Sequence, residues 1–191
     1  MAQRTFAKES KLILGFIGLI WLVFLADILL PVELATWGIV PRSPDSLPGI
    51  MTMPFVHARL SHIVGNTVPL FVLLVLLAGS RTHSAEVVIT VLLAGGALLW
   101  CFGRGGRCHV GASGLIYGLI AFLIVAGIRE KRFVSLSVAI CIGLLYGSTL
   151  LSGILPTVGR SISWDGHLAG AIAGGTTALL SVRPGNPASV S

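Results

Sequence analysis

The chain has 191 residues, of which 54% are hydrophobic and only 10% are charged. A soluble globular domain has about 25% charged residues, so this composition excludes an ordinary water-soluble fold. The formal net charge of +6 does not indicate nucleic-acid binding, because the basic residues are scattered singly and form no stripe or arm. The composition predicts an integral protein of the lipid bilayer.

Six apolar segments approach the roughly 20 residues that a membrane-spanning helix needs. The predicted helices cover about residues 11–30, 62–78, 86–102, 113–128, 133–151 and 166–182. The first segment is too long for a signal-peptide core and no cleavage pattern follows it, so it is kept as a span. We expect an all-α six-helix membrane domain over residues 11–183. Residues 1–10 are predicted to form a cytoplasmic N-terminal segment, and residues 184–191 a disordered tail.

The joint between the first two helices, residues 31–60, is long and rich in proline. Its prolines are Pro31, Pro41, Pro44, Pro48 and Pro54. Proline disfavours a regular helix, and the apolar side chains among these prolines argue against a loose linker. We therefore expect an ordered loop that is partly set into the membrane interface.

The distribution of Lys and Arg near helix ends predicts the orientation of the chain. The termini and even-numbered joints hold Arg4, Lys8, Lys11, Arg81, Arg129, Lys131, Arg132 and Arg183. The odd-numbered joints hold Arg42, Arg59, Arg104, Arg107 and Arg160. This bias favours a multi-pass protein of the cell membrane with both termini in the cytoplasm.

The three cysteines have neither CxxC spacing nor a neighbouring His/Cys cluster, so they indicate no metal site and no disulfide framework. We expect free thiols at Cys101, Cys108 and Cys141. Pairing of Cys101 with Cys108 outside the cell stays open.

Polar residues are costly within membrane helices and are therefore informative about function. They gather at the starts of three predicted helices. These residues are His57, His62 and Asn66, then Ser113 and Tyr117, and finally Asp165 and His167. Because the chain crosses the membrane between successive helices, all three starts lie on the outer side. Residues more than a hundred positions apart in the sequence are thus expected at the same depth in the membrane.

Ser113 is the candidate nucleophile. The adjacent glycines, Gly111 and Gly114, allow a sharp entry into the helix and leave the hydroxyl uncovered. A serine hydroxyl needs a base to take its proton, and His167 is the natural base. A GxSG sequence alone is weak, since small residues also serve helix packing.

Two glycine ladders predict that the fourth and sixth helices pack closely together. The ladders are Gly114 with Gly118, and Gly166 with Gly170 and Gly174. Such ladders let helix backbones approach in lipid. This packing would bring His167 to Ser113.

His62 and Asn66 lie four residues apart on one helical face, so both side chains can point inward as oxyanion donors. Simpler interpretations exist: Asn66 as an interhelical hydrogen bond and Tyr117 as an interfacial anchor. The joint occurrence at three helix starts favours a catalytic site.

The chain resembles the rhomboid family of intramembrane proteases, in a minimal six-helix bacterial form. The matching segments are His57 to Asn66 for the family's HxxxxHxxxN, Gly111 to Tyr117 for GxSGxxxY, and Gly166 to Gly174 for its histidine and glycine ladder. The resemblance covers roughly residues 11 to 183. The first loop departs from the pattern, because it lacks the Trp-Arg pair of some bacterial members.

The resemblance implies a serine endopeptidase with Ser113 as nucleophile and His167 as general base. His62, Asn66 and the Ser113 backbone amide would form the oxyanion hole. Tyr117 would stack on His167.

Two further residues receive supporting roles or none. His57 would brace the loop rather than take part in the chemistry. Asp165 invites a triad, but we expect it to lie outside the helix.

The implied partners are the lipid bilayer and a transmembrane protein that is cleaved near the outer end of its helix. No cofactor, metal or nucleic acid is expected. The alternatives are a catalytically inactive rhomboid-like protein that binds clients, and a small transporter. Retention of Ser113 and His167 argues against the first, and the clustering of polar residues at one face argues against the second. The substrate's identity and the oligomeric state stay open.

Overall fold

The computed structural model describes residues 2–31, 33–81, 83–156 and 163–185. These ranges contain six long helices and no strand, only an isolated bridge. The long helices are α1 (Ala2–Leu29), α3 (Leu60–Ser80), α4 (Ser84–Phe102), α5 (Ser113–Glu130), α6 (Phe133–Gly153) and α7 (Trp164–Ser181). The predicted all-α membrane bundle is confirmed, and α3 to α7 begin and end within two residues of their predicted bounds.

Two helix starts differ from prediction. Helix α1 begins at Ala2, so the predicted N-terminal segment continues the first helix; neither proline nor glycine interrupts residues 2–14. Asp165 lies in the first turn of α7, so its expected position outside the helix was wrong. A carboxylate there is favoured by the helix dipole. At the predicted tail, the Gly185 amide donates to the Arg129 carbonyl at 2.8 Å, while residues 186–191 lie outside the described part.

The long first joint is ordered by short helical turns. These are η1 (Leu34–Trp37), η2 (Pro44–Ser46), α2 (Gly49–Thr52) and η3 (Met53–Phe55). The Thr52 hydroxyl donates to the Trp37 carbonyl at 2.6 Å, and Ile39 exchanges two backbone hydrogen bonds with His109. The joint is thereby tied to the glycine-rich loop, residues 103–112, that precedes α5.

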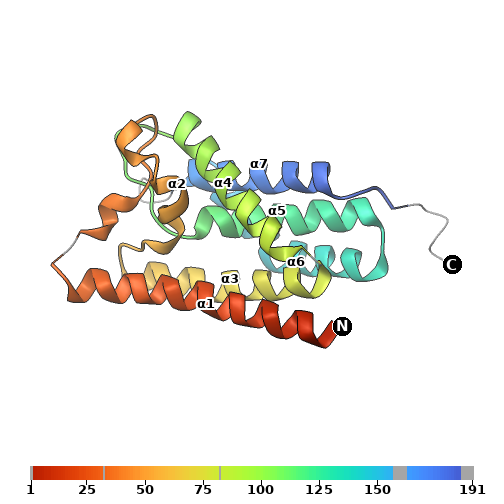
Figure 1. The fold of residues 1–191 in the computed structure, drawn as a ribbon. Helices are drawn as coiled ribbons and strands as arrows, with labels where there is room; N and C mark the ends of the chain where they lie inside the picture. The colour runs from red at the N-terminus through yellow and green to blue at the C-terminus, as the bar shows by residue number, and fades with distance from the viewer. Residues whose placement is uncertain (1, 32, 82, 157–162, 186–191) are drawn as a thin grey trace.

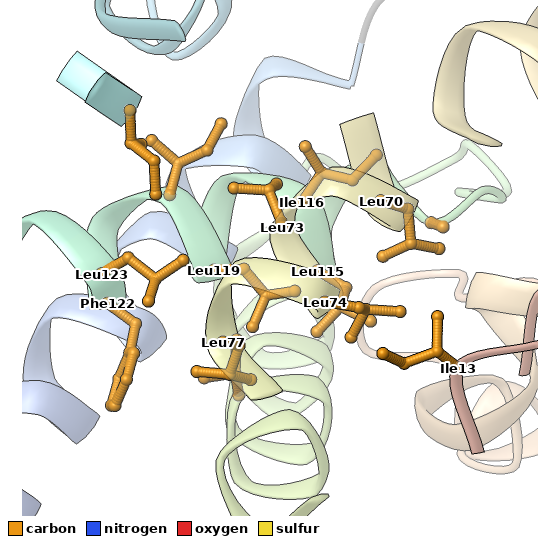
Figure 2. Close-up of a cluster of buried hydrophobic side chains, with 14 of the residues drawn as sticks. Ile13, Leu70, Leu73, Leu74, Leu77, Leu115, Ile116, Leu119, Phe122 and Leu123 are labelled. Carbon is orange, nitrogen blue, oxygen red and sulfur yellow. The ribbon is translucent and has the colours of Figure 1, made fainter. Parts of the chain in front are cut away.

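Helix α5 is the centre of the bundle and packs most extensively against α7 and α6. Leucines of α3 and α5 meet in the apolar core, among them Leu73, Leu77 and Leu119 (Figure 2). The predicted packing of the glycine ladders is confirmed: an added Cβ at Gly170 would lie 1.9 Å from the Gly114 carbonyl oxygen. The two backbones are in contact because neither helix has a side chain there.

Five helices among the described residues are long and apolar enough to cross a membrane: residues 8–29 of α1, and α3 to α6. Their outer faces expose large apolar side chains, such as Leu144, which is 81% exposed and would be unfavourable in water. Helix α7 is not in this group, and it carries Asp165, His167 and several glycines. The chain is a multi-pass membrane protein.

The starts of α3, α5 and α7 lie at one end of the bundle, together with the ordered first joint (Figure 1). Both ends of the described chain lie at the opposite end. This alternation brings the polar helix starts together, as the order of the helices predicts. Arg160, which contributed to the orientation prediction, lies outside the described residues.

Candidate active site

Ser113 and His167 meet at this end of the bundle. Ser113 is the first residue of α5, and its Oγ lies 2.9 Å from Nε2 of His167 in the first turns of α7. Ser113 is half-buried, and His167 is buried. Both line an open cavity of about 640 Å³, which we call the serine cavity; His62, Asn66 and Tyr117 also line it.

The Gly153 carbonyl determines which nitrogen of His167 carries the proton. This carbonyl, at the last residue of α6, lies 3.0 Å from Nδ1 of His167. A carbonyl only accepts hydrogen bonds, so Nδ1 is protonated and Nε2 presents its lone pair to the Ser113 hydroxyl. A backbone carbonyl leaves no residue signature, and sequence reasoning missed this contact.

Tyr117 fixes the plane of the His167 ring. The two rings are stacked, with centroids 4.0 Å apart and planes only 6° apart. The Tyr117 hydroxyl donates to the Thr149 carbonyl of α6 at 2.8 Å. An added Cβ at Gly153 would lie 1.7 Å from the Tyr117 hydroxyl, so a side chain there would displace this ring.

His57 and Asn66 form a buried pair behind the cavity. The Asn66 amide donates to Nε2 of His57 at 3.0 Å, and the Ala112 amide approaches the same nitrogen at 3.4 Å. Because both partners are donors, His57 is neutral and carries its proton on Nδ1. Burial and the nearby His62 lower the pKa of His57 to about 4, although the Phe55 carbonyl opposes this shift.

Gly111 occupies the space directly beside the two predicted oxyanion donors. Its φ of +106° is one that side-chain-bearing residues rarely adopt. An added Cβ would lie 2.6 Å from Nε2 of His62 and 3.4 Å from Nδ2 of Asn66. The glycine thus leaves both nitrogens clear of any side chain at position 111.

Asp165 is hydrogen-bonded to the glycine-rich loop and to the Ser163 hydroxyl, which donates to its carboxylate at 3.4 Å. Its carboxylate accepts from the Arg104 backbone amide at 2.8 Å and from the Arg104 guanidinium at 3.0 Å. His109 lies 3.7 Å from the same carboxylate and 2.7 Å from the Ser163 hydroxyl. No hydrogen bond joins Asp165 to His167 among the described residues, so this carboxylate connects the loop before Ser113 to the helix that carries His167.

Sequence reasoning used Arg104 only for the orientation of the chain and did not assign Arg104, His109 or Ser163 to the site. The available signal was a histidine within a polar joint only two residues before Gly111. Burial lowers the pKa of His109, and the positive charges of Arg104 and Arg107 add to this effect, while Asp165 and the Arg104 carbonyl oppose it. His109 is therefore a neutral part of this network near pH 7.

All three cysteines are free thiols, including Cys101 and Cys108, whose pairing the sequence left open. The Cys108 thiol donates to the Ala35 carbonyl at 3.2 Å. Among the described residues, no group of three His, Cys, Asp or Glu side chains is arranged to hold a metal ion.

Comparison with known proteins gives a consistent set of matches. The family model described as Rhomboid domain matches residues 44–184. An uncharacterized protein of Mycobacterium tuberculosis strain H37Rv is 40% identical over 182 residues, which cover 90% of this chain and 75% of the relative. An uncharacterized protein of Mycobacterium leprae is also 40% identical over 182 residues, covering 90% of this chain and 71% of the relative.

Proposed function

The chain belongs to the rhomboid family, and on this premise we propose that it is a serine endopeptidase that cleaves membrane proteins within the bilayer. The observation that carries the proposal is the hydrogen bond of 2.9 Å between Ser113 Oγ and His167 Nε2, with Nδ1 held by the Gly153 carbonyl. A hydroxyl beside an unprotonated, oriented imidazole is the arrangement that nucleophilic catalysis requires.

In the proposed reaction, His167 Nε2 takes the hydroxyl proton as Ser113 Oγ attacks the carbonyl carbon of the scissile peptide bond. The tetrahedral intermediate collapses when His167 returns that proton to the leaving nitrogen, which frees one product and leaves an acyl ester on Ser113. Water then attacks the ester with His167 again as base, releasing the second product. The Gly153 carbonyl accepts a hydrogen bond from Nδ1 of the imidazolium formed in each step, so it orients the ring as the acidic member of a triad would, but with a dipole in place of a full negative charge.

The negative charge of the tetrahedral intermediate needs hydrogen-bond donors. We propose that His62, Asn66 and the Ser113 amide supply them. His62 and Asn66 line the same cavity as Ser113, and their nitrogens lie beside Gly111, which has no side chain to cover them. Asn66 is suited to this role because its bond to His57 holds the amide in place before substrate arrives.

We further propose six membrane spans, with α7 as the sixth and both termini in the cytoplasm. Helix α7 can be less apolar than the others because it packs against α5 and α4. The serine cavity then lies near the outer surface. A substrate helix must unwind there to expose a peptide bond, so we expect cleavage near its outer end, at residues that form helix weakly.

A fluorophosphonate probe tests the proposal directly. Such a probe should label Ser113 in the full chain, and labelling should disappear in Ser113→Ala and in His167→Ala. The same preparations should be assayed with a single-span model substrate in vesicles. Labelling without cleavage of any membrane substrate would favour a client-binding protein that retains an activated serine, and absence of both would refute the protease.

A further inference from the structure

The described lining of the serine cavity carries more positive than negative charge. Three of its described lining residues are arginines, and none is aspartate or glutamate; the arginines are Arg59, Arg104 and Arg107. Asp165, next to this lining, has a side chain only 8% exposed and is already bound by Arg104. Residues 157–162, outside the described part, contain no acidic residue in the sequence. The cavity therefore presents a positive surface to an incoming segment.

The exposed arginines come from two different elements. Arg59 directly precedes α3, three residues before His62, and its side chain is exposed. Arg107 lies in the glycine-rich loop, two residues before His109, and is also exposed. Because both line the cavity that holds Ser113, a segment that reaches Ser113 passes close to positive charge from both elements.

We infer that the serine cavity selects substrates that carry a carboxylate in the outer segment next to the cleaved bond. This inference rests on the proposed protease function and names its substrate class. Complementary charge favours correct encounter and register, whereas like charge repels. The outer flanks of membrane proteins are poor in Lys and Arg, so natural substrates meet little repulsion there. Each exposed pair contributes modestly, and two together predict a preference of about threefold to tenfold in kcat/KM.

The test uses full-length protein in phosphatidylcholine vesicles and three single-span peptides that differ at one position just outward of the cleaved bond. This position holds Asp, Asn or Lys. The wild type should cleave the Asp peptide about threefold to tenfold better than the Asn peptide and the Lys peptide least well. Raising NaCl from about 50 mM to about 500 mM should shrink the preference, because salt screens exposed charges.

Charge variants make the test specific. In the double variant Arg59→Gln with Arg107→Gln, the Asp/Asn ratio should fall toward one. In Arg59→Glu with Arg107→Glu, the order should reverse in favour of the Lys peptide, which loss of folding does not explain. Arg132→Gln is the matched control, since this exposed arginine directly precedes α6 at the opposite end of the bundle. It should keep the wild-type ratio.

Several outcomes would overturn the inference. Equal cleavage of the Asp and Asn peptides by the wild type would do so, as would an Asp preference that survives in both double variants. If the double variants lose activity equally toward all three peptides, and only in phosphatidylglycerol vesicles, the arginines bind lipid headgroups and not the substrate. Cleavage without a charge preference refutes this inference but not the proposed protease function. Absence of both cleavage and probe labelling would refute the protease function as well.

Discussion

The His167 imidazole lies flat against the Tyr117 phenol ring, with centroids 4.0 Å apart and planes 6° apart. Tyr117 is itself held by its hydrogen bond to the Thr149 carbonyl. The orientation of the proposed base thus depends on a ring from α5 that is anchored to α6.

Two substitutions of Tyr117 should distinguish the effect of its stacking on His167 from that of its hydrogen bond to the Thr149 carbonyl. Tyr117→Phe keeps the stacked ring and loses one hydrogen bond, which should cost about 1 kcal/mol of unfolding free energy and leave kcat within a few-fold of wild type. Tyr117→Ala frees the His167 ring and should lower kcat by about 10²-fold, since misplacement of a reacting group by about 1 Å has that effect. Single-turnover cleavage and thermal melts measure both; equal kcat in the two variants would contradict the positioning role.

A side chain at position 111 should damage the site more than the fold. Gly111→Ala places a methyl group against His62 at a positive φ, so we expect kcat to fall by at least about 10²-fold through displaced oxyanion donors. Gly79→Ala is the control: this α3 glycine has nothing within 4 Å of an added Cβ. The control should be neutral or stabilising by up to about 1 kcal/mol. Similar activity in both variants would argue against the assignment.

Asn66→Ala tests whether this amide acts in the transition state. If it donates to the oxyanion, kcat should fall by about 10²-fold to 10³-fold with little change in KM. If it only holds His57 and α3 in place, the variant should lose about 0.6 kcal/mol of stability and keep its turnover. Rate and melting temperature measured on one preparation distinguish the two, and a destabilised variant with wild-type kcat would remove Asn66 from the site.

One Arg–carboxylate pair, Arg104 with Asp165, lies at the serine end of the bundle and another, Arg81 with Glu130, at the far end, and only the first should matter for turnover. Asp165→Asn weakens the connection between Arg104 and α7, so we expect kcat to fall about tenfold as Ser113 and His167 lose their fixed separation. Glu130→Gln removes the Arg81 pair at the far end, which should lower the melting temperature and preserve kcat. A wild-type kcat in Asp165→Asn would show that this carboxylate contributes only to stability.

His57 should make stability depend on pH. Its pKa in the folded protein is about 4, below the ordinary 6.5, so the unfolded state binds the proton first as pH falls. The free energy of unfolding is therefore highest above about pH 6.5. It decreases as the pH falls toward 4, by about 1.4 kcal/mol per pH unit at its steepest. Melting curves of wild type and His57→Asn across this range measure the effect. Parallel pH profiles would exclude His57 as the source.

Much of the fold follows directly from the order of residues. Uncharged segments of membrane-spanning length determine the helices, and successive crossings place every second helix start at the same end. Glycine spacing adds that α5 and α7 touch, since only a helix face without side chains permits such close approach. These local and topological rules were enough to gather Ser113, His167, His62 and Asn66 at one end of the bundle.

The tertiary structure decided which groups act on these residues. The partner of His167 Nδ1 is a main-chain carbonyl at Gly153, and any residue type supplies a carbonyl, so no pattern in the sequence marks it. Asp165 binds Arg104, 61 positions away, instead of the histidine two positions along, because the glycine-rich loop folds over the start of α7. Spacing along the chain determines which face of a helix a side chain occupies. The partners of that side chain depend on which other segment packs beside it, and only the tertiary structure determines this packing.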